Sequence, residues 1–224
     1  RAVAVGGTAA AGYTVSGLAP GIVTLRGGFT AVDILGGSGN DTYAILVALP
    51  ALHVDAGMGN DTLDYSSWAT GVAVNLAAGT ATGIARGVSG FENAYGGAGN
   101  DTLVGDGLDN ILVGNAGNDT LSGGAGNDFL VGGAGNDTVD GGDGDDLLVA
   151  GVLTGGVDLD RDRRIATTWA QSYGDQSAAY QALAGFVPAT PPSSGDRLTG
   201  GDGFDWFWAT APNVVDLGFF ERVG

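Results

Sequence analysis

The chain has 224 residues, of which 44 are Gly, and carries a formal net charge of −17. It holds 23 Asp, two Glu and no Lys, so binding to nucleic acid or to anionic lipid is not expected. The absence of Cys excludes disulfides and thiolate metal sites, and no apolar run reaches the ~18 residues of a membrane span. Because the first residue is Arg1, we expect the chain to be a piece of a longer protein.

Residues 1–95 are predicted to form short strands separated by tight turns. GGSGND at 36–41 and DAGMGND at 55–61 each lie between apolar runs, and Asp41 and Asp61 are twenty residues apart. Residues 71–95 alternate apolar and polar side chains over short stretches, which is typical of strands. We expect this part to form irregular N-terminal solenoid turns.

Residues 96–149 form six contiguous units of nine residues: GGAGNDTLV, GDGLDNILV, GNAGNDTLS, GGAGNDFLV, GGAGNDTVD and GGDGDDLLV. Position six is Asp in five units and Asn110 in the second, and position eight is always Leu or Val. The glycines allow the chain to turn so that carbonyls converge, and converging carbonyls and carboxylates favour a hard cation. Ca²⁺ accepts such flexible oxygen sets more readily than Mg²⁺. A disordered glycine-rich linker is the alternative, and the strict recurrence of an apolar residue argues against it.

These units resemble the repeats-in-toxin (RTX) family, whose nonapeptide is GGxGxDxUx with U large and apolar. The resemblance implies an all-β fold, a right-handed parallel β-roll. The first six residues of each unit would form a calcium-binding turn and the last three a strand. Two units would make one coil, so units eighteen residues apart would stack.

The resemblance also implies that several calcium ions lie between stacked turns. Stacking would pair Asp101 with Asp119, Asp119 with Asp137, Asp128 with Asp146, and Asn110 with Asp128. Asn110 supplies a neutral oxygen, so the site that it shares should be weak or empty. The expected ligands are the side chains of Asp41, Asp61, Asp101, Asn110, Asp119, Asp128, Asp137, Asp146 and Asp205, with the carbonyls of Gly97, Gly99, Gly117, Gly126 and Gly135.

The eighteen-residue period predicts two different outer faces. Even-numbered units expose an apolar stripe through Ile111, Phe129 and Leu147, whereas odd-numbered units are mostly polar at the same positions. An apolar stripe of this size should be covered. Either the segment that follows the array covers it, or a neighbouring molecule does. Self-association through this face or through the ends of the solenoid is therefore a second expectation.

The period ends after Val149, and residues 150–195 are expected to be an excursion that folds over the roll or caps it. The pattern predicts helix from about Arg163 to Ala184, followed by a Pro-rich linker. Residues 196–224 should form a final calcium turn and a C-terminal cap. Asp158, Asp160 and Asp162 alternate like ligands of a further calcium site; the alternative is a solvated loop that pairs with neighbouring Arg side chains.

The predicted function is structural. The chain would be a calcium-dependent β-solenoid segment of a secreted Gram-negative surface protein, adhesin or extracellular assembly, folding after type I secretion. The alternative is the folding and secretion module of a secreted enzyme, such as a lipase, protease or polysaccharide-modifying enzyme, whose catalytic domain lies elsewhere. No HExxH or GxSxG motif is present, so we expect no catalysis by this chain. Its four Trp either pack or form a sugar-stacking platform, and no receptor or glycan is identified.

Overall fold

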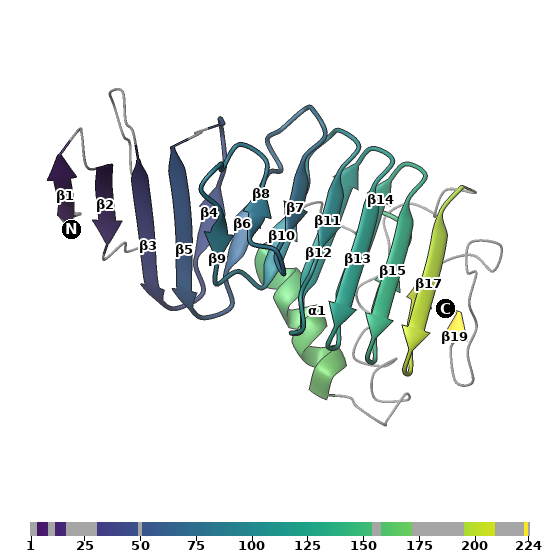
Figure 1. Cartoon of the computed structure of the whole chain (residues 1–224). Helices are drawn as coiled ribbons and strands as arrows, with labels where there is room; N and C mark the ends of the chain where they lie inside the picture. The colour runs from purple at the N-terminus through teal and green to yellow at the C-terminus, as the bar shows by residue number, and fades with distance from the viewer. Residues whose placement is uncertain are drawn as a thin grey trace.

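The computed structural model of the chain describes residues 4–8, 12–16, 31–48, 51–153, 158–171, 195–208 and 222–223. In these ranges short strands stack side by side along one axis, and a helix lies against one face of the stack (Figure 1). The predicted helix C-terminal to residue 171 and the Pro-rich linker fall outside the described residues.

The strands form three sheets. The N-terminal sheet contains, in order, β1 (Ala4–Thr8), β2 (Gly12–Ser16), β3 (Val32–Ser38), β5 (Leu52–Met58) and β9 (Val88–Ser89). The long sheet contains β19 (Arg222–Val223), β18 (Trp206–Trp208), β16 (Leu147–Val149), β14 (Phe129–Ala134), β12 (Ile111–Ala116), β10 (Asn93–Tyr95), β6 (Thr62–Asp64) and β4 (Thr42–Ala44). The facing sheet contains β17 (Arg197–Asp202), β15 (Thr138–Asp143), β13 (Thr120–Ala125), β11 (Thr102–Val104), β7 (Ala73–Asn75) and β8 (Thr80–Ala81).

The strand register confirms the eighteen-residue coil. β11 pairs with β13 so that Leu103 lies opposite Leu121, and β12 pairs with β14 in the same way, both in parallel. The N-terminal coil is longer, because Val32 of β3 lies opposite Leu52 of β5. The excursion does not break the stack: β17 joins β15 and β18 joins β16, both in parallel. The fold is therefore a parallel β-roll, with antiparallel pairing only of β1 with β2 and of β7 with β8 among its named strands.

The main core lies between the long sheet and the facing sheet. Side chains at position eight of every unit point into this space, where successive Leu and Val residues stack along the axis. All six are fully buried or nearly so: Leu103, Leu112, Leu121, Leu130, Val139 and Leu148. The strict apolar position eight of the sequence is thus a core position.

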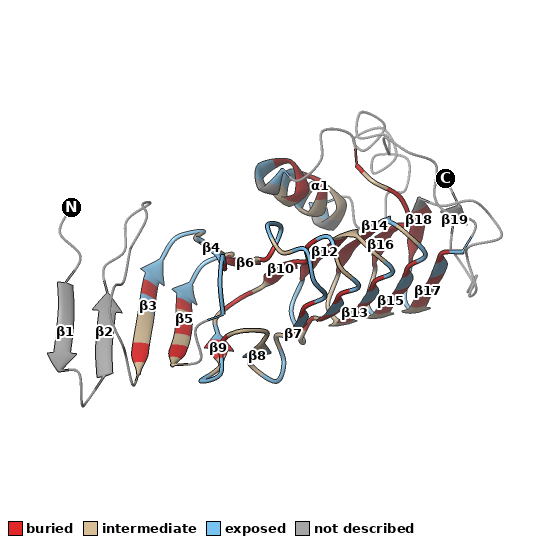
Figure 2. Cartoon of the chain, turned by 90° about the horizontal axis from the view of Figure 1, so that it is seen from above, coloured by how far each residue is buried: buried red, intermediate tan, exposed pale blue. Residues whose placement is uncertain are grey.

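The apolar stripe of the even-numbered units is covered by the helix α1 (Leu159–Gln171), which crosses the outer face of the long sheet (Figure 2). Ile165 of α1 is fully buried against the stripe, and Phe129 is 1% exposed. The ring of Trp169 packs on that of Trp206 with centroids 5.8 Å apart. The expectation that the excursion folds over the roll is therefore confirmed for this helix.

The helix begins earlier than the sequence pattern predicted. Asp158 precedes it and accepts a hydrogen bond from the backbone N–H of Arg161 at 2.9 Å, which is the role of an N-cap residue. The acidic residues Asp160 and Asp162 lie in its first turn, where negative charge interacts favourably with the helix dipole. A capping signal was thus present in the sequence, although the apolar spacing alone placed the start near Arg163.

Three of the four Trp side chains serve packing. Trp68 packs against the main core and donates its indole N–H to the carbonyl of Ile45, while Trp169 and Trp206 belong to the apolar cluster beneath α1. This arrangement does not form an exposed sugar-stacking platform from these three residues. No helix in the described ranges is long and apolar enough to cross a membrane.

We expect Phe129→Asp to destabilise the folded chain, because it places a charge within the apolar cluster beneath α1. Loss of the aromatic packing alone costs about 3–5 kcal/mol. Thr120→Asp is the matched control, since Thr120 occupies position seven of the adjacent unit and is exposed on the facing sheet. Thermal unfolding in saturating calcium, with sedimentation to record the oligomeric state, measures both variants. Equal melting temperatures for Phe129→Asp and Thr120→Asp would contradict the role of α1 in covering the apolar stripe.

Candidate metal centre

The turns of the roll form two columns, one at each position-six register. The first turn column contains Asp101, Asp119, Asp137 and Asp196. The second turn column contains Asp41, Asp61, Glu92, Asn110, Asp128, Asp146 and Asp205. The pairs predicted from the eighteen-residue spacing are all adjacent in these columns.

Each position-six Asp uses one carboxylate oxygen to tie its coil to the preceding one. In the first turn column the N–H of Asp101 donates to Oδ1 of Asp119 at 2.8 Å, and the N–H of Asp119 donates to Oδ1 of Asp137 at 2.9 Å. In the second turn column the N–H of Asp128 donates to Oδ1 of Asp146 at 2.8 Å. These bonds fix the side chains inside the turns, and every one of these carboxylates is buried.

In five of these residues the other carboxylate oxygen has no hydrogen-bond partner in the described part of the chain, whereas Oδ2 of Asp101 accepts the N–H of Gly97 at 2.6 Å. These five are the buried Oδ2 atoms of Asp61, Asp119, Asp128, Asp137 and Asp146. A buried charged oxygen without a partner costs several kcal/mol. Its recurrence at the same position of successive coils indicates that these oxygens require a cation.

Oxygen atoms from two coils converge at each of these turns. A Cβ added to Gly114 would overlap both Oδ2 of Asp119 and the carbonyl oxygen of Gly132 in the next coil, and the same holds at Gly123 for Asp128 and Gly141. Among the described residues, no group of three or more His, Asp or Glu side chains is placed to hold a metal. Backbone carbonyls must therefore complete the ligand set, and an all-oxygen set of carboxylates and carbonyls suits Ca²⁺.

The predicted carbonyl ligands lie at the contacts between coils. The carbonyl oxygens of Gly99, Gly117 and Gly126 each point at the glycine one coil further on, Gly117, Gly135 and Gly144, so closely that a Cβ there would overlap them. Gly135 has a φ of +152°, which only glycine adopts readily. The carbonyl of Gly97 accepts a hydrogen bond from the N–H of Ala116 at 3.1 Å. These positions are compatible with ligation, which stays a prediction for all five residues.

A second series of hydrogen bonds between coils, the position-five ladder, runs in the opposite direction: each backbone N–H donates to the side chain of the preceding coil, not of the following one. The N–H of Asn118 donates to the side-chain oxygen of Asn100, and the N–H of Asn136 donates to that of Asn118, both at 2.9 Å. In the second turn column the N–H of Asp145 donates to Asn127 at 2.8 Å. Each turn is therefore bonded to the coils on both sides, and the ladder uses Asn and Asp because their side chains are short.

Burial raises the pKa values of three carboxyls in the columns to near or above neutral pH. The pKa values of Asp119 and Asp128 rise to about 7, and that of Asp146 rises to about 8. The largest cause is loss of solvation, which the N–H from the neighbouring coil offsets in part; nearby carboxylates add to the rise. These carboxyls therefore bind protons at higher pH than an ordinary Asp does, so protons compete with a cation for the turns.

Asn110 occupies its predicted place in the second turn column but its side chain makes different contacts. Oδ1 of Asn110 accepts the N–H of Asp106 at 2.8 Å, and Nδ2 donates to the carbonyl of Glu92 at 2.9 Å. An N–H donor cannot ligate a cation, which agrees with the expectation of a weak or empty site. Asp41 is partly exposed at the end of the column, where its N–H donates to Oδ1 of Asp61 at 2.6 Å.

The further calcium site expected at Asp158, Asp160 and Asp162 is not formed. Asp158 caps α1, Asp160 is exposed, and Asp162 is fully buried in contact with Arg161. The expectation is wrong because the segment is a helix, which separates alternate side chains instead of bringing them together as a loop would. The alternative of a solvated loop is wrong for the same reason, although the pairing with Arg161 is present.

Two members of the columns were missed. Asp196 continues the first turn column, since its Oδ1 accepts the N–H of Asp137 at 3.0 Å. It stands nine residues before Asp205, a signal that could have identified it. Glu92 lies one coil before Asn110 and accepts the N–H of Asp61 with Oε2 at 2.7 Å. Its spacing of eighteen residues from Asn110 was visible, but a lone Glu outside the array does not match the motif.

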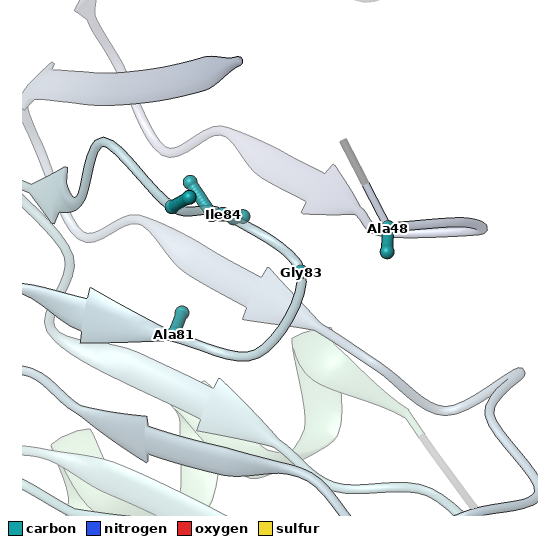
Figure 3. A pocket seen from close by; sticks show the side chains of 5 residues that line it. Ala48, Ala81, Gly83 and Ile84 are labelled. Carbon is teal, nitrogen blue, oxygen red and sulfur yellow. The ribbon is translucent and has the colours of Figure 1, made fainter. Parts of the chain in front are cut away.

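A pocket away from the columns offers no comparable chemistry. It is lined by Ala48, Ala81, Gly83, Ile84 and Ala85, none of which carries a polar side chain (Figure 3). The turn columns are therefore the candidate site.

Comparison with protein families agrees with this geometry. The RTX calcium-binding nonapeptide repeat matches four segments, residues 86–121, 104–138, 122–152 and 193–211. These segments are RTX repeats. The matched residues include the regular coils and the turn that resumes the stack after the excursion. Comparison with curated proteins gave no match.

RTX repeats bind several calcium ions per array and occur in secreted Gram-negative proteins, and the repeat is structural, not catalytic. The oxygen-only turns of this chain fit that ion, since the buried Oδ2 atoms of Asp61, Asp119, Asp128, Asp137 and Asp146 have no hydrogen-bond partner in the described residues. The residues that would hold calcium are the position-six Asp side chains and the glycine carbonyls around them, which stays a prediction.

We expect Gly123→Ala to weaken calcium-dependent folding, because its methyl group would overlap Oδ2 of Asp128 and the carbonyl of Gly141. Such crowding costs about 1–3 kcal/mol. Gly107→Ala is the matched control, since a Cβ at Gly107 would meet no atom within 4 Å. Circular dichroism during calcium titration compares the two variants. A midpoint for Gly123→Ala equal to that for Gly107→Ala would refute the crowding argument.

We also expect calcium to bind less tightly as the pH falls from 8 to 6. Burial raises the pKa values of Asp137, Asp119 and Asp146 to about 6, 7 and 8, above the ~3.9 of Asp in an unfolded chain. The metal-free fold is therefore most favoured at low pH and loses stability as the pH rises through these values. Calcium must displace these protons, so its midpoint should be several-fold higher at pH 6 than at pH 8. Identical midpoints would contradict protonation of the columns.

Proposed function

We propose that this chain is a calcium-dependent structural segment of a secreted protein, folding into its β-roll when it meets calcium outside the cell. The observation that carries the proposal is the set of buried Oδ2 atoms that lack a hydrogen-bond partner in the described part of the chain, found in both turn columns. A single unsatisfied carboxylate is a local defect, whereas a periodic set at metal-ligating positions indicates a periodic ligand.

The charge of the chain opposes folding in the absence of cations. A net charge of −17 and 44 glycines favour an expanded chain, through repulsion and backbone entropy. Calcium, when bound, supplies positive charge between adjacent coils, so its binding free energy contributes to folding. The chain's own part is to align the coils: Oδ1 of each position-six Asp holds the N–H of the preceding coil, and position eight fills the core.

This coupling suits a protein that is exported unfolded. Calcium is scarce inside cells and abundant outside, so the chain would stay expanded during type I secretion and fold afterwards. We favour a role as a rigid segment of a surface protein, adhesin or extracellular assembly, since the described residues form a continuous stack with α1 packed along it. A folding module of a secreted enzyme would use the same coupling, and the sequence of the complete polypeptide separates the two roles.

Calcium added to the chelator-treated chain should produce a cooperative gain of β circular dichroism. The midpoint should lie on the order of 0.1–1 mM, the range of extracellular calcium modules. Mg²⁺ at the same concentration should have much less effect, because it prefers a stricter, largely hydrated octahedron. A chain that is equally folded in excess chelator would overturn the proposal.

Individual ligands can be tested by Asp128→Ala against Asp145→Ala. Asp128 is fully buried in the second turn column, with one oxygen lacking a partner, whereas Asp145 belongs to the position-five ladder and bonds the N–H of Phe204 at 2.9 Å. For Asp128→Ala the calcium concentration at the midpoint of folding should be well above that for Asp145→Ala. Equal shifts would show that position six has no special role.

A further inference from the structure

The second turn column changes character where the irregular coils meet the regular roll. From Asp128 onward each position-six carboxylate accepts an N–H from the coil before it. At Asn110 this polarity is reversed, because Nδ2 donates to the carbonyl of Glu92 at 2.9 Å. The N–H of Glu92 turns away and donates to the carbonyl of Asp61 at 3.3 Å. The contact between these two coils is thus made by the chain's own donor.

The next contact, between the Asp61 and Glu92 coils, is also made by donors from the chain. Nδ2 of Asn93 donates to the carbonyl of Asp61 at 2.8 Å and to Oδ1 of Asn60 at 2.9 Å. Arg163 of α1 reaches the same turn: Nη2 donates to the carbonyl of Asn60 at 2.8 Å and to Oγ1 of Thr62 at 3.0 Å, and Nε donates to Oδ1 of Asn60 at 3.0 Å. Three oxygens of this turn, on Asn60 and Thr62, are therefore occupied by N–H groups. Oδ2 of Asp61 in the same turn is buried with no hydrogen-bond partner in the described residues, so it still requires positive charge nearby, and the guanidinium of Arg163 is a charge that reaches this turn.

The helix is anchored at this same coil. Asp162 is fully buried, and its Oδ2 accepts a hydrogen bond from the hydroxyl group of Tyr95, in β10, at 2.7 Å. Arg161 donates to the other oxygen of Asp162 through Nε at 2.8 Å, so the carboxylate is satisfied. Further along α1, the indole N–H of Trp169 donates to the carbonyl of Asp145 at 2.8 Å. The helix therefore connects the irregular coils to the regular calcium-type coils.

We propose that the two contacts joining the Asp61, Glu92 and Asn110 coils bind no calcium, and that the guanidinium of Arg163 replaces the metal there as an internal cation. Arg163 is a positioning residue that fixes the Asn60–Thr62 turn, and α1 braces the junction. Three donors of one planar group reach oxygens of two residues in the turn, a match that suits Arg and not a compact ammonium. The inference rests on the calcium-dependent folding proposed above.

The first experiment counts bound calcium by native mass spectrometry in the full chain. Glu92→Gln should bind as many ions as the unaltered chain, because Glu92 is a hydrogen-bond acceptor and not a ligand. Asp128→Asn should bind fewer. Loss of an ion from Glu92→Gln would overturn the absence of calcium at the junction, whereas an unchanged count for Asp128→Asn would instead overturn the ligands assigned under the proposed function.

The second experiment compares Arg163→Met with Arg164→Met, its exposed neighbour on α1. Hydrogen exchange is measured in saturating calcium. The amides of Asp61, Thr62 and Asn93 should exchange at least about tenfold faster in Arg163→Met, because their turn has lost its cation. Raising the calcium concentration further should not restore them, and the amides of Asp119 and Asp128 should be unchanged. Equal exchange in the two variants, or full rescue by calcium, would refute the role of Arg163.

Discussion

The structure depends on a carboxylate that is held by one oxygen and left unsatisfied at the other. Oδ1 of Asp119 or Asp128 bonds the N–H of the coil before it, while Oδ2 is buried without a partner in the described residues. The first contact sets the eighteen-residue register of the roll. The second makes the stack unfavourable until a cation is present. One side chain therefore determines both the geometry of the fold and its dependence on calcium.

The same carboxylate explains why glycine is needed in the repeat. Position one of the nine-residue unit has no room for a side chain, because Oδ2 and a carbonyl oxygen of the next coil occupy the space, as at Gly123. Position four has none because the coils touch backbone to backbone, as at Gly117 and Gly135. Since glycine backbone and Asp and Asn side chains fill the turns of the regular units, apolar burial there is concentrated at position eight and in the stripe beneath α1. A narrow core of this kind contributes less stabilisation than that of a globular domain, which is why metal binding must contribute to folding.

The sequence predicted the regular part of this arrangement well, since a motif repeated every nine residues encodes register, core and ligand position together. It predicted the junction poorly. Glu92 and Arg163 act through contacts between residues 31 and about a hundred positions apart, from Asp61 to Glu92 and from Asn60 to Arg163. No local period marks such pairs. The start of α1 and the failure of the Asp158–Asp162 calcium site have a common cause: alternating Asp residues fit a calcium loop and a capped helix equally well until tertiary packing selects one.

The helix α1 contacts the irregular coils, where the eighteen-residue repeat of calcium turns is interrupted. Between Asp61 and Glu92 the chain makes a 31-residue coil, and the carboxylate that accepts the N–H of Asp61 belongs to the longer side chain of Glu92, whereas an Asp takes this place in the eighteen-residue coils. A metal needs several oxygens to converge, whereas a guanidinium needs only to be held in place by its own element. Ile165 and Trp169 hold α1 on the apolar stripe, and the stripe exists only once the even-numbered strands have stacked. Formation of the regular coils thus builds the platform that brings Arg163 to the irregular ones, so calcium binding in the array stabilises the N-terminal coils without a calcium ion at the junction.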